Sequence, residues 1–309
     1  MNVLVTGGAG YIGHELVREL LSNEQVSKIV IYDNLSARNY NLFLNHNFPQ
    51  KKISFIKGEL LDSRKLKKVI TDIDVVYHLA AKVSNPQAAT EAHAYEQSNN
   101  WGTAELVYAV EESNVSKFIY VSSTSVYGST QQLVDADYFP NPISFYGSSK
   151  LRGEAHVKRL FNKIQTYIIR SANVFGYSDG MRFDTVINRF MFDANFNGRI
   201  QIQGNGDQVR SFVHIEKITN VLHNLLKISD FPSGIYNLIG VNLTVNQVAE
   251  VVHSLYPKME MIYLNQHIKM PSLKIEPDAD LNKIITLPHQ SIEDDLKHFK
   301  SKFSFSSFD

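Results

Sequence analysis

Short apolar runs alternate with amphipathic segments from the start of the chain to about residue 170. Apolar runs of strand length occupy residues 2–6, 28–32, 53–56, 75–79, 117–121 and 166–170. Between them, apolar residues recur with helical spacing in segments 12–21, 60–70 and 101–112, and again in a segment that starts near Phe145. Strands that alternate with helices indicate an α/β fold with a doubly wound parallel sheet.

The pattern becomes less regular after Gly176. Helical spacing in segments 184–195, 215–228 and 243–255 is interleaved with short strand-like runs at 199–202, 209–213 and 235–238. This mixture predicts a smaller, mixed α/β unit. We therefore expect a first domain over residues 1–175 and a second over residues 176–309, with segments near 211–240 returning to the first.

A glycine-rich turn, Gly7-Gly8-Ala9-Gly10-Tyr11-Ile12-Gly13, separates the first strand from the first helix. Glycine at position 7 allows a tight turn, and Gly10 lets the backbone approach a pyrophosphate at the helix N-terminus. Gly13 lets the helix pack closely on the strand. In a strand–turn–helix–strand context, this spacing predicts a dinucleotide site.

Asp33 ends the second predicted strand, where an acid can accept hydrogen bonds from an adenosine ribose. Its charge would repel a 2′-phosphate, so the sequence favours NAD over NADP. Arg38 is close enough in sequence to leave this preference open.

The composition of the chain excludes several classes of binding partner and of chemistry. Lys plus Arg and Asp plus Glu both number 31, so neither nucleic acid nor a membrane is expected as a partner. The chain has no cysteine, which excludes disulfides and thiolate chemistry, and no metal site is expected. The sequence shows no signal-peptide pattern and no apolar segment of membrane-spanning length. We therefore expect a cytoplasmic protein.

Tyr146 and Lys150 are four residues apart, and Ser144 precedes them as a helix cap. On a helix this spacing places both side chains on one face. An ammonium beside a phenol favours the phenolate, so we expect the pKa of Tyr146 to fall below its reference of about 10. Such a tyrosine can exchange protons near neutral pH. Taken alone, the pair fits a surface Tyr and a solvated Lys better, and the rest of the chain decides.

Two predicted strands end in small or hydroxyl residues, Ala80-Ala81 and Ser122-Ser123-Thr124-Ser125. In an open parallel sheet the carboxyl ends of the strands form the ligand crevice. Small residues there let a ligand lie against the strand end. His78, inside the preceding strand, is expected to be a packed core residue and not a catalyst.

Several motifs occur together in one order. They are Thr6 to Gly13, Asp33-Asn34-Leu35-Ser36, His78-Leu79-Ala80-Ala81, Asn99 before Gly102-Thr103, Ser122-Ser123 before Val126-Tyr127-Gly128, Tyr146 with Lys150, and Gly204 to His214. Over about residues 1–255 the chain thus resembles the extended short-chain dehydrogenase/reductase family of NAD-dependent nucleotide-sugar epimerases and dehydratases. Its pattern is most similar to that of UDP-glucose 4-epimerase-like enzymes. The resemblance implies a Rossmann domain for NAD and a second domain for a nucleotide sugar.

The resemblance also implies roles for residues. Tyr146 would be the acid/base, Lys150 would lower its pKa and bind the nicotinamide ribose, and Ser123 would bind the same sugar oxygen. The implied NAD site comprises Gly7, Gly10, Tyr11, Ile12, Gly13, Asp33, Asn34, Ser36, Glu59, Leu60, Leu79, Ala80, Ala81, Asn99, Tyr146 and Lys150. The implied site for a nucleotide-diphosphate sugar comprises Val83, Ser84, Ser123, Thr124, Asn173 and Arg210, with Arg210 clamping the diphosphate. A homodimer through helices near 101–112 and 145–161 is also implied.

Departures from the family pattern reduce the number of reactions that the chain is expected to catalyse. Dehydratases and decarboxylases of the family usually carry a carboxylate where this chain has Thr124 and Ser125, and elimination needs such an acid/base group. Glu59 stands where the family usually has Asp beside adenine. The Arg that often makes a second diphosphate contact is not evident, and Lys269 and Lys274 are candidates to replace it.

We therefore predict an NAD-dependent nucleotide-sugar 4-epimerase that works through a transient 4-keto intermediate. The alternative is a 4-dehydrogenase or ketoreductase of the same family, which performs the first half-reaction without the return. A 4,6-dehydratase and a non-catalytic NAD-binding sensor fit the residues less well.

Overall fold

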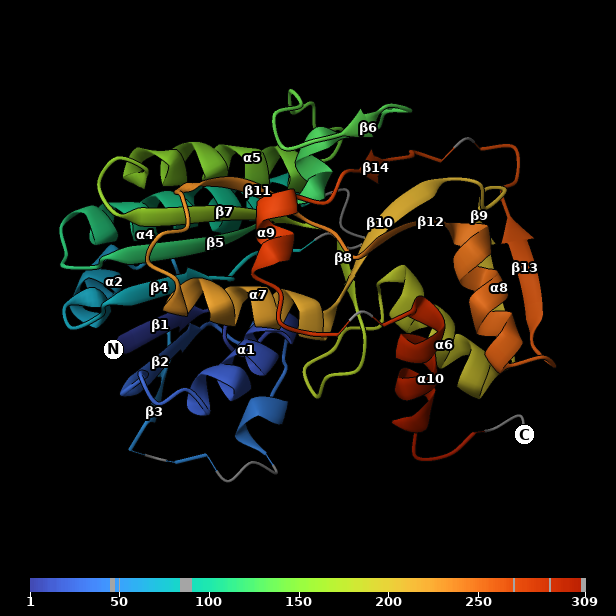
Figure 1. The fold of residues 1–309 in the computed structure, drawn as a ribbon, viewed down its shortest axis with the longest axis horizontal. Helices are drawn as coiled ribbons and strands as arrows, with labels where there is room; N and C mark the ends of the chain where they lie inside the picture. The colour runs from blue at the N-terminus through green and yellow to red at the C-terminus, as the bar shows by residue number, and fades with distance from the viewer. Residues whose placement is uncertain (45–47, 50, 84–90, 269, 289, 307–309) are drawn as a thin grey trace.

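A seven-stranded parallel sheet forms the larger part of the molecule (Figure 1). The computed structural model describes residues 1–44, 48–49, 51–83, 91–268, 270–288 and 290–306. The strand order is β11-β7-β5-β4-β1-β2-β3, which reverses direction beside β1 as in a doubly wound fold. The strands are β1 (Asn2–Thr6), β2 (Lys28–Asp33), β3 (Ile53–Lys57), β4 (Val75–His78), β5 (Lys117–Ser123), β7 (Gln165–Ser171) and β11 (Gly234–Leu238).

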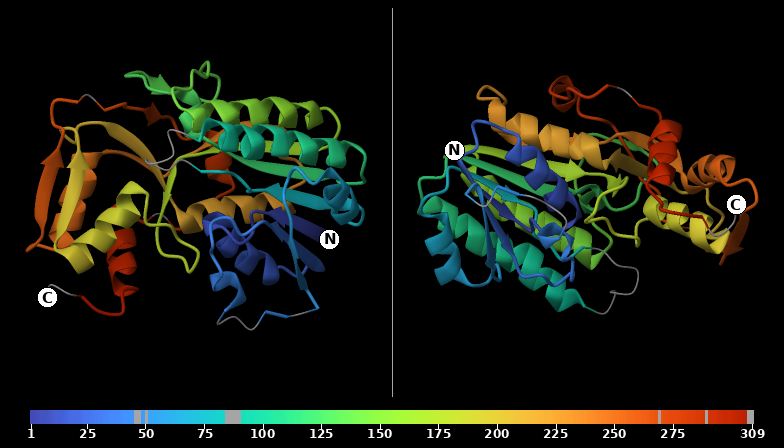
Figure 2. Two further views of the ribbon diagram at one scale, coloured as in Figure 1. Left: turned by 180° about the vertical axis from the view of Figure 1, so that it is seen from behind. Right: turned by 90° about the horizontal axis from the view of Figure 1, so that it is seen from below.

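Helices cover both faces of this sheet (Figure 2). One face carries α1 (Tyr11–Leu21) and α7 (Ile215–Lys227), and the other carries α2 (Ser63–Ile70), α4 (Gly102–Glu111) and α5 (Phe145–Val157). Because successive strand residues point to opposite faces, Val3 and Val5 of β1 pack in the first layer and Leu4 packs in the second. Apolar side chains on both faces explain why the strands read as continuous hydrophobic runs.

Elements in the second half of the chain form a smaller unit with its own apolar core. It contains β8 (Asn173–Phe175), β10 (Val209–His214) and β12 (Val241–Thr244) in one sheet, and β9 (Arg199–Gln203) paired with β13 (Glu260–Leu264). Its helices are α6 (Val186–Asn197), α8 (Val245–Leu255) and α10 (Ile292–Ser301). The short strands β6 (Leu133–Val134) and β14 (Lys274–Ile275) pair with each other, and α9 (Ala279–Lys283) lies against β11.

The predicted fold class is confirmed, although the sequence did not predict β13, α9 or α10, and two helices begin later than expected. The helix expected over residues 60–70 begins at Ser63, because the Asp62 side chain accepts a hydrogen bond from Lys65 N (3.1 Å) and caps it. The helix expected over residues 243–255 begins at Val245, because Thr244 and Gln247 form a capping box. No helix in the described ranges is both long and apolar enough to cross a membrane.

Candidate active site

The glycine turn between β1 and α1 has the geometry that its residues predict. Gly7 has a φ of +72°, and a Cβ there would lie 2.5 Å from Ala80 N at the end of β4. A Cβ on Gly13 would lie 2.3 Å from the Gly7 carbonyl oxygen, so the helix start packs directly on the turn. Gly10 is the N-cap of α1 and brings no capping side chain, so the first backbone N–H groups of α1 stay available to an anion.

Replacing Gly7 with alanine is therefore expected to destabilise the protein and to abolish dinucleotide binding. The left-handed conformation alone costs about 1–2 kcal/mol for a residue with a Cβ, and the approach to the Ala80 backbone adds to this cost. Urea unfolding and NAD titration calorimetry measure the two effects. Gly234→Ala is the matched control, because Gly234 has no positive φ and its Cβ would approach only the Tyr236 ring. Equal behaviour of the two variants would contradict the requirement at Gly7.

Asp33 connects this turn to the loop after β2. Its carboxylate accepts hydrogen bonds from Ala9 N (3.1 Å) and Leu35 N (2.7 Å). Burial raises the pKa of Asp33, whereas these two backbone donors oppose the rise. The neighbouring Asn34 donates to Glu59 at the end of β3 (3.0 Å) and accepts from Ser36 N (2.8 Å). The structure thus brings Asp33, Asn34, Ser36 and Glu59 together at the carboxyl ends of β2 and β3.

Ser123, Tyr146 and Lys150 meet at the carboxyl end of β5. Ser123 ends that strand, and Tyr146 lies in the first turn of α5, where the Ser144 side chain caps the helix by accepting from Gly147 N (3.0 Å). A hydrogen bond between Ser123 and Tyr146 lowers the pKa of the tyrosine. Lys150 is buried one turn further along, and its Nζ donates to the Val121 carbonyl (2.8 Å).

The predicted lowering of the Tyr146 pKa by Lys150 is not seen. Burial raises the pKa of Tyr146, and the groups that lower it are Ser123 and the charge of Arg182. The Lys150 ammonium lies over the Tyr120 ring, 4.1 Å from its centroid, and burial lowers its own pKa to about 7. A buried ammonium turned toward a carbonyl and an aromatic ring does little for the phenolate. The predicted placement of the two residues at one end of α5 holds, and only the predicted effect of Lys150 on the pKa of Tyr146 is wrong.

The end of β4 forms the next part of the crevice. Leu79 N donates to the Thr6 carbonyl (3.1 Å), which places Leu79, Ala80 and Ala81 beside the glycine turn. The buried Asn99 binds both backbone groups of Lys82 and donates to Ser149 Oγ (2.9 Å). It sits in a π-helical turn, Glu96–Trp101, of a kind that often occurs at functional sites. Leu60, from the loop before α2, is buried against Gly102 at the start of α4.

His78 is packed in the core, as predicted. It is fully buried, with Nδ1 2.8 Å from Thr6 Oγ1 and Nε2 2.9 Å from Thr103 Oγ1. Burial holds its pKa well below the ordinary value, so the ring is neutral. The two threonine contacts join β1, β4 and α4 behind the site.

The residues predicted to bind substrate differ in how far they are buried. Thr124 is buried after β5, whereas Val83 is exposed and its carbonyl accepts from Tyr95 OH (3.4 Å). Asn173 is exposed and donates to the Ser211 carbonyl (3.0 Å). Ser84 and Lys269 lie outside the described residues, and Lys274 is exposed on β14.

Arg210 of β10 is half-buried, and burial lowers its pKa. Within the described residues its guanidinium has no hydrogen-bond or ion-pair partner. A partly desolvated cation without a counter-ion is suited to an anionic ligand group. This geometry fits the diphosphate role that the resemblance implies.

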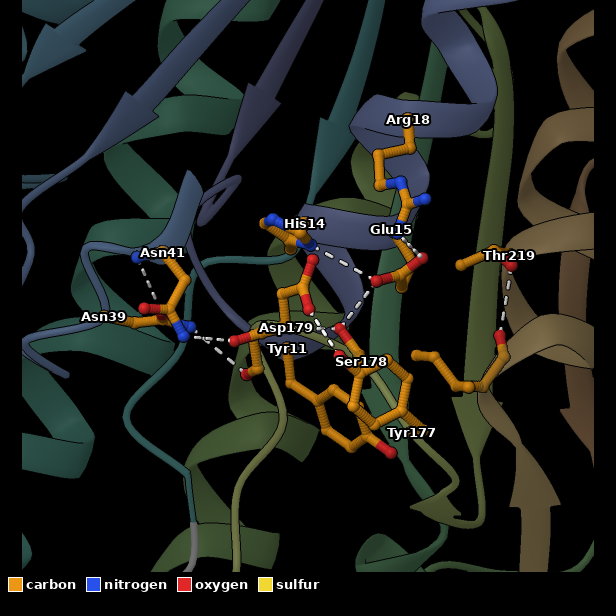
Figure 3. Close-up of polar contacts among 12 residues, drawn as sticks. Tyr11, His14, Glu15, Arg18, Asn39, Asn41, Tyr177, Ser178, Asp179 and Thr219 are labelled. Atoms are coloured by element: carbon orange, nitrogen blue, oxygen red, sulfur yellow. Dashed lines mark hydrogen bonds and ion pairs between the residues drawn. The ribbon is translucent and has the colours of Figure 1, made fainter. Parts of the chain in front are cut away.

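Sequence reasoning missed Arg182. It lies just beyond the segment 177–180, which crosses to the dinucleotide half and is fastened to α1 (Figure 3). Ser178 Oγ donates to Glu15 (2.7 Å), and Tyr11 OH donates to the Gly176 carbonyl (2.5 Å). The Tyr11 hydroxyl is therefore used within the protein, which leaves its backbone for the predicted cofactor contact. No motif in the sequence marks Arg182, because its effect on Tyr146 depends on the path of this segment.

Comparison with known proteins agrees with this geometry. The NAD dependent epimerase/dehydratase family matches residues 3–238. The chain therefore belongs to this family of NAD-dependent enzymes, as the motifs predicted.

Three relatives illustrate the range of the family. The chain is 32% identical to human dTDP-D-glucose 4,6-dehydratase over 80% of this chain and 71% of that protein. It is 31% identical to a putative UDP-glucose 4-epimerase of Methanocaldococcus jannaschii, over 84% of this chain and 85% of that protein. Among solved structures, UDP-glucuronic acid 4-epimerase from Bacillus cereus, in complex with UDP-glucuronic acid and NAD, superimposes with a TM-score of 0.85. That structure is 26% identical and covers 97% of this chain and 98% of its own.

Proposed function

We propose that the protein is an NAD-dependent nucleotide-sugar 4-epimerase. The proposal rests on the group Ser123, Tyr146 and Lys150 beside the glycine turn, where no carboxylate among the described residues acts on the Tyr146 hydroxyl. The groups that act on the Tyr146 hydroxyl are Ser123, Arg182 and Tyr95, and none of them is an acid. Such a site can move one proton at one hydroxyl, which suits oxidation and reduction at a single carbinol carbon.

The residues of the site fit NAD. The uncapped start of α1 offers backbone N–H groups to a pyrophosphate, and Asp33 stands at the end of β2, where a ribose is expected. When bound, NAD would accept a hydride from the sugar and return it. We assign the nicotinamide ribose contact to Lys150 and the pyrophosphate contact to the backbone around Gly10.

Proton handling falls to the residues of this chain. Tyr146 takes the proton of the C4 hydroxyl as that carbon is oxidised, and Ser123 holds the same oxygen. The 4-keto sugar then turns in the site while Arg210 keeps the diphosphate in place. Tyr146 returns the proton when the carbon is reduced from the other side, which gives the C4 epimer.

Relatives of this chain include dehydratases as well as epimerases. Eliminating water requires one group that protonates the leaving hydroxyl and another that takes a proton from carbon. Thr124 and Ser125, which follow Ser123, offer only hydroxyls of ordinary acidity. We therefore favour the epimerase over the 4,6-dehydratase.

The test is a reaction of the purified protein and NAD with a panel of UDP-, dTDP- and GDP-sugars. Proton NMR of the sugar reports inversion at C4, and absorbance reports NADH. We expect an equilibrium mixture of C4 epimers without net NADH. Stoichiometric NADH would instead establish the 4-dehydrogenase, and loss of water from the sugar would establish the dehydratase.

We further propose that the enzyme is a homodimer and acts in the cytoplasm. The helices α4 and α5 lie side by side on the outside of the sheet (Figure 1). Three large side chains on or next to these helices are exposed: Trp101 is 58% exposed, Tyr108 42% and Phe145 53%. Aromatic residues are enriched in the cores of protein interfaces.

Replacing Trp101 and Tyr108 together with glutamate is expected to convert the dimer into a monomer, because each protomer would place two carboxylates in the buried interface. Sedimentation velocity measures the change. Phe305→Glu, at a position that is 69% exposed near the other end of the chain, is the control. A wild-type monomer, or a dimer that survives both glutamates, would rule out this interface.

A further inference from the structure

A row of buried polar side chains lies between α5 and the sheet. Lys150, Glu154 and Arg170 are each at most 2% exposed. Arg170 Nε donates to Glu154 Oε1 (3.0 Å) and Nη2 donates to Oε2 (2.7 Å), which makes a two-point ion pair. Ser122 Oγ adds a third hydrogen bond to Oε1 (2.6 Å). The Glu154 carboxylate is thus held from β5 and β7 at once.

Glu154 lies one helical turn beyond Lys150, on the same face of α5. Burial lowers the pKa of Lys150, and the charge of Glu154 opposes this lowering, with a net value of about 7. Without the carboxylate, burial alone would act on the ammonium. The charge of Glu154 therefore favours the charged form of Lys150.

The other groups around Lys150 do not replace this charge. The Tyr120 ring of β5 lies beneath the ammonium, and Tyr146 of α5 is a neutral phenol. His78 of β4 is neutral because burial holds its pKa well below the ordinary value. Arg170 of β7 is a cation, but its guanidinium is paired with Glu154.

We propose that Glu154 is a positioning residue that keeps Lys150 charged at the carboxyl end of β5, and that Arg170 and Ser122 hold its carboxylate for that task. Ser122 directly precedes Ser123, so the same carboxylate ties the strand end that carries Ser123 to the helix that carries Tyr146. The use of the Lys150 charge in catalysis rests on the proposed function. The charge itself does not, and it is measured first.

The first test follows the titration of Lys150 by NMR in protein labelled at lysine Cε, freed of bound nucleotide. Lys150→Arg identifies the resonance. In the wild type we expect a midpoint near pH 7. In Glu154→Gln/Arg170→Met, which removes both charges without leaving either one unpaired, we expect the midpoint to fall by about one pH unit or more.

The control variant Arg189→Met/Asp193→Asn removes an ion pair from α6, where Arg189 is 56% exposed, and should leave the Lys150 midpoint unchanged. An unchanged midpoint in the Glu154/Arg170 variant would overturn the proposal and leave the pair a purely structural role. If that variant fails to fold, Glu154→Asp and Glu154→Asn replace it, because they shorten the side chain equally and differ in charge. The Asp variant should then keep the higher midpoint, and equal midpoints would overturn the proposal.

The second test is the pH profile of NAD binding and of turnover. Since the ammonium is lost as pH rises through its pKa, the alkaline limb of both profiles should move to lower pH in Glu154→Gln/Arg170→Met by the shift that NMR measures. One pH unit corresponds to about a tenfold lower charged fraction on that limb. Lower stability with an unmoved limb would count against the proposal. Absence of epimerase activity in the wild type would remove only the turnover arm.

Discussion

Replacing Tyr146 with phenylalanine is expected to lower kcat by roughly 10²- to 10⁴-fold, the range that general acid/base catalysis contributes. The substitution removes one oxygen and leaves the ring against Tyr95, whose centroid is 6.2 Å away. In the proposed mechanism this phenol takes the sugar proton, and Ser123 only holds the same oxygen. Turnover of the epimer pair measures the loss, and NAD and sugar-nucleotide affinities should change little.

Tyr263→Phe is the matched control for this prediction. It also removes a phenol oxygen, one that donates to Asn246 Oδ1 (3.1 Å) in the smaller unit, far along the chain from the site. Its kcat should equal that of the wild type. If Tyr146→Phe kept wild-type turnover, the proton would have to leave by another route, and the proposed mechanism would be wrong.

The fold class and the glycine turn could be predicted from the sequence, because these depend on local signals. The spacing of Gly7, Gly10 and Gly13 required a tight turn beneath a helix, and the structure has that turn. The hydroxyls after β5 had to lie at the carboxyl edge of a parallel sheet. Patterns of this kind depend on a few neighbouring residues, so they can be interpreted without knowledge of the tertiary contacts.

The electrostatics of the site could not be predicted in the same way. The spacing of Tyr146 and Lys150 predicts that they share one helix face. It does not predict that the Lys150 ammonium contacts the carbonyl of Val121. The charge that does lower the Tyr146 pKa belongs to Arg182, which is 36 residues further along the chain. Arg182 follows a segment that is hydrogen-bonded to α1 through Ser178 and Glu15. The buried pair of Glu154 and Arg170 likewise joins a helix to a strand. Such effects depend on distances between segments that no local pattern records.

Replacing Arg210 with methionine is expected to lower kcat/KM for nucleotide sugars by roughly 100-fold, mainly through KM. A hydrogen bond to a charged group contributes about 1.5–3 kcal/mol, and every 1.4 kcal/mol is tenfold in affinity. Methionine keeps much of the apolar stem that packs within β10 but cannot bind a diphosphate. Because Arg210 has no partner within the described residues, its removal leaves no buried acid behind, and stability should not fall.

Further variants distinguish a bidentate contact between Arg210 and the diphosphate from a general electrostatic attraction. Arg210→Lys keeps the charge but not the planar fork, so it should recover only part of the affinity. Arg199→Met removes an exposed arginine from β9, which belongs to a different sheet, and should leave KM unchanged. Affinity for the nucleoside diphosphate alone, measured by calorimetry, should fall as much as affinity for the whole substrate, because the lost contact is to the diphosphate. A loss seen only with the sugar attached would move Arg210 from the diphosphate to the sugar, and an unchanged KM would remove it from the site.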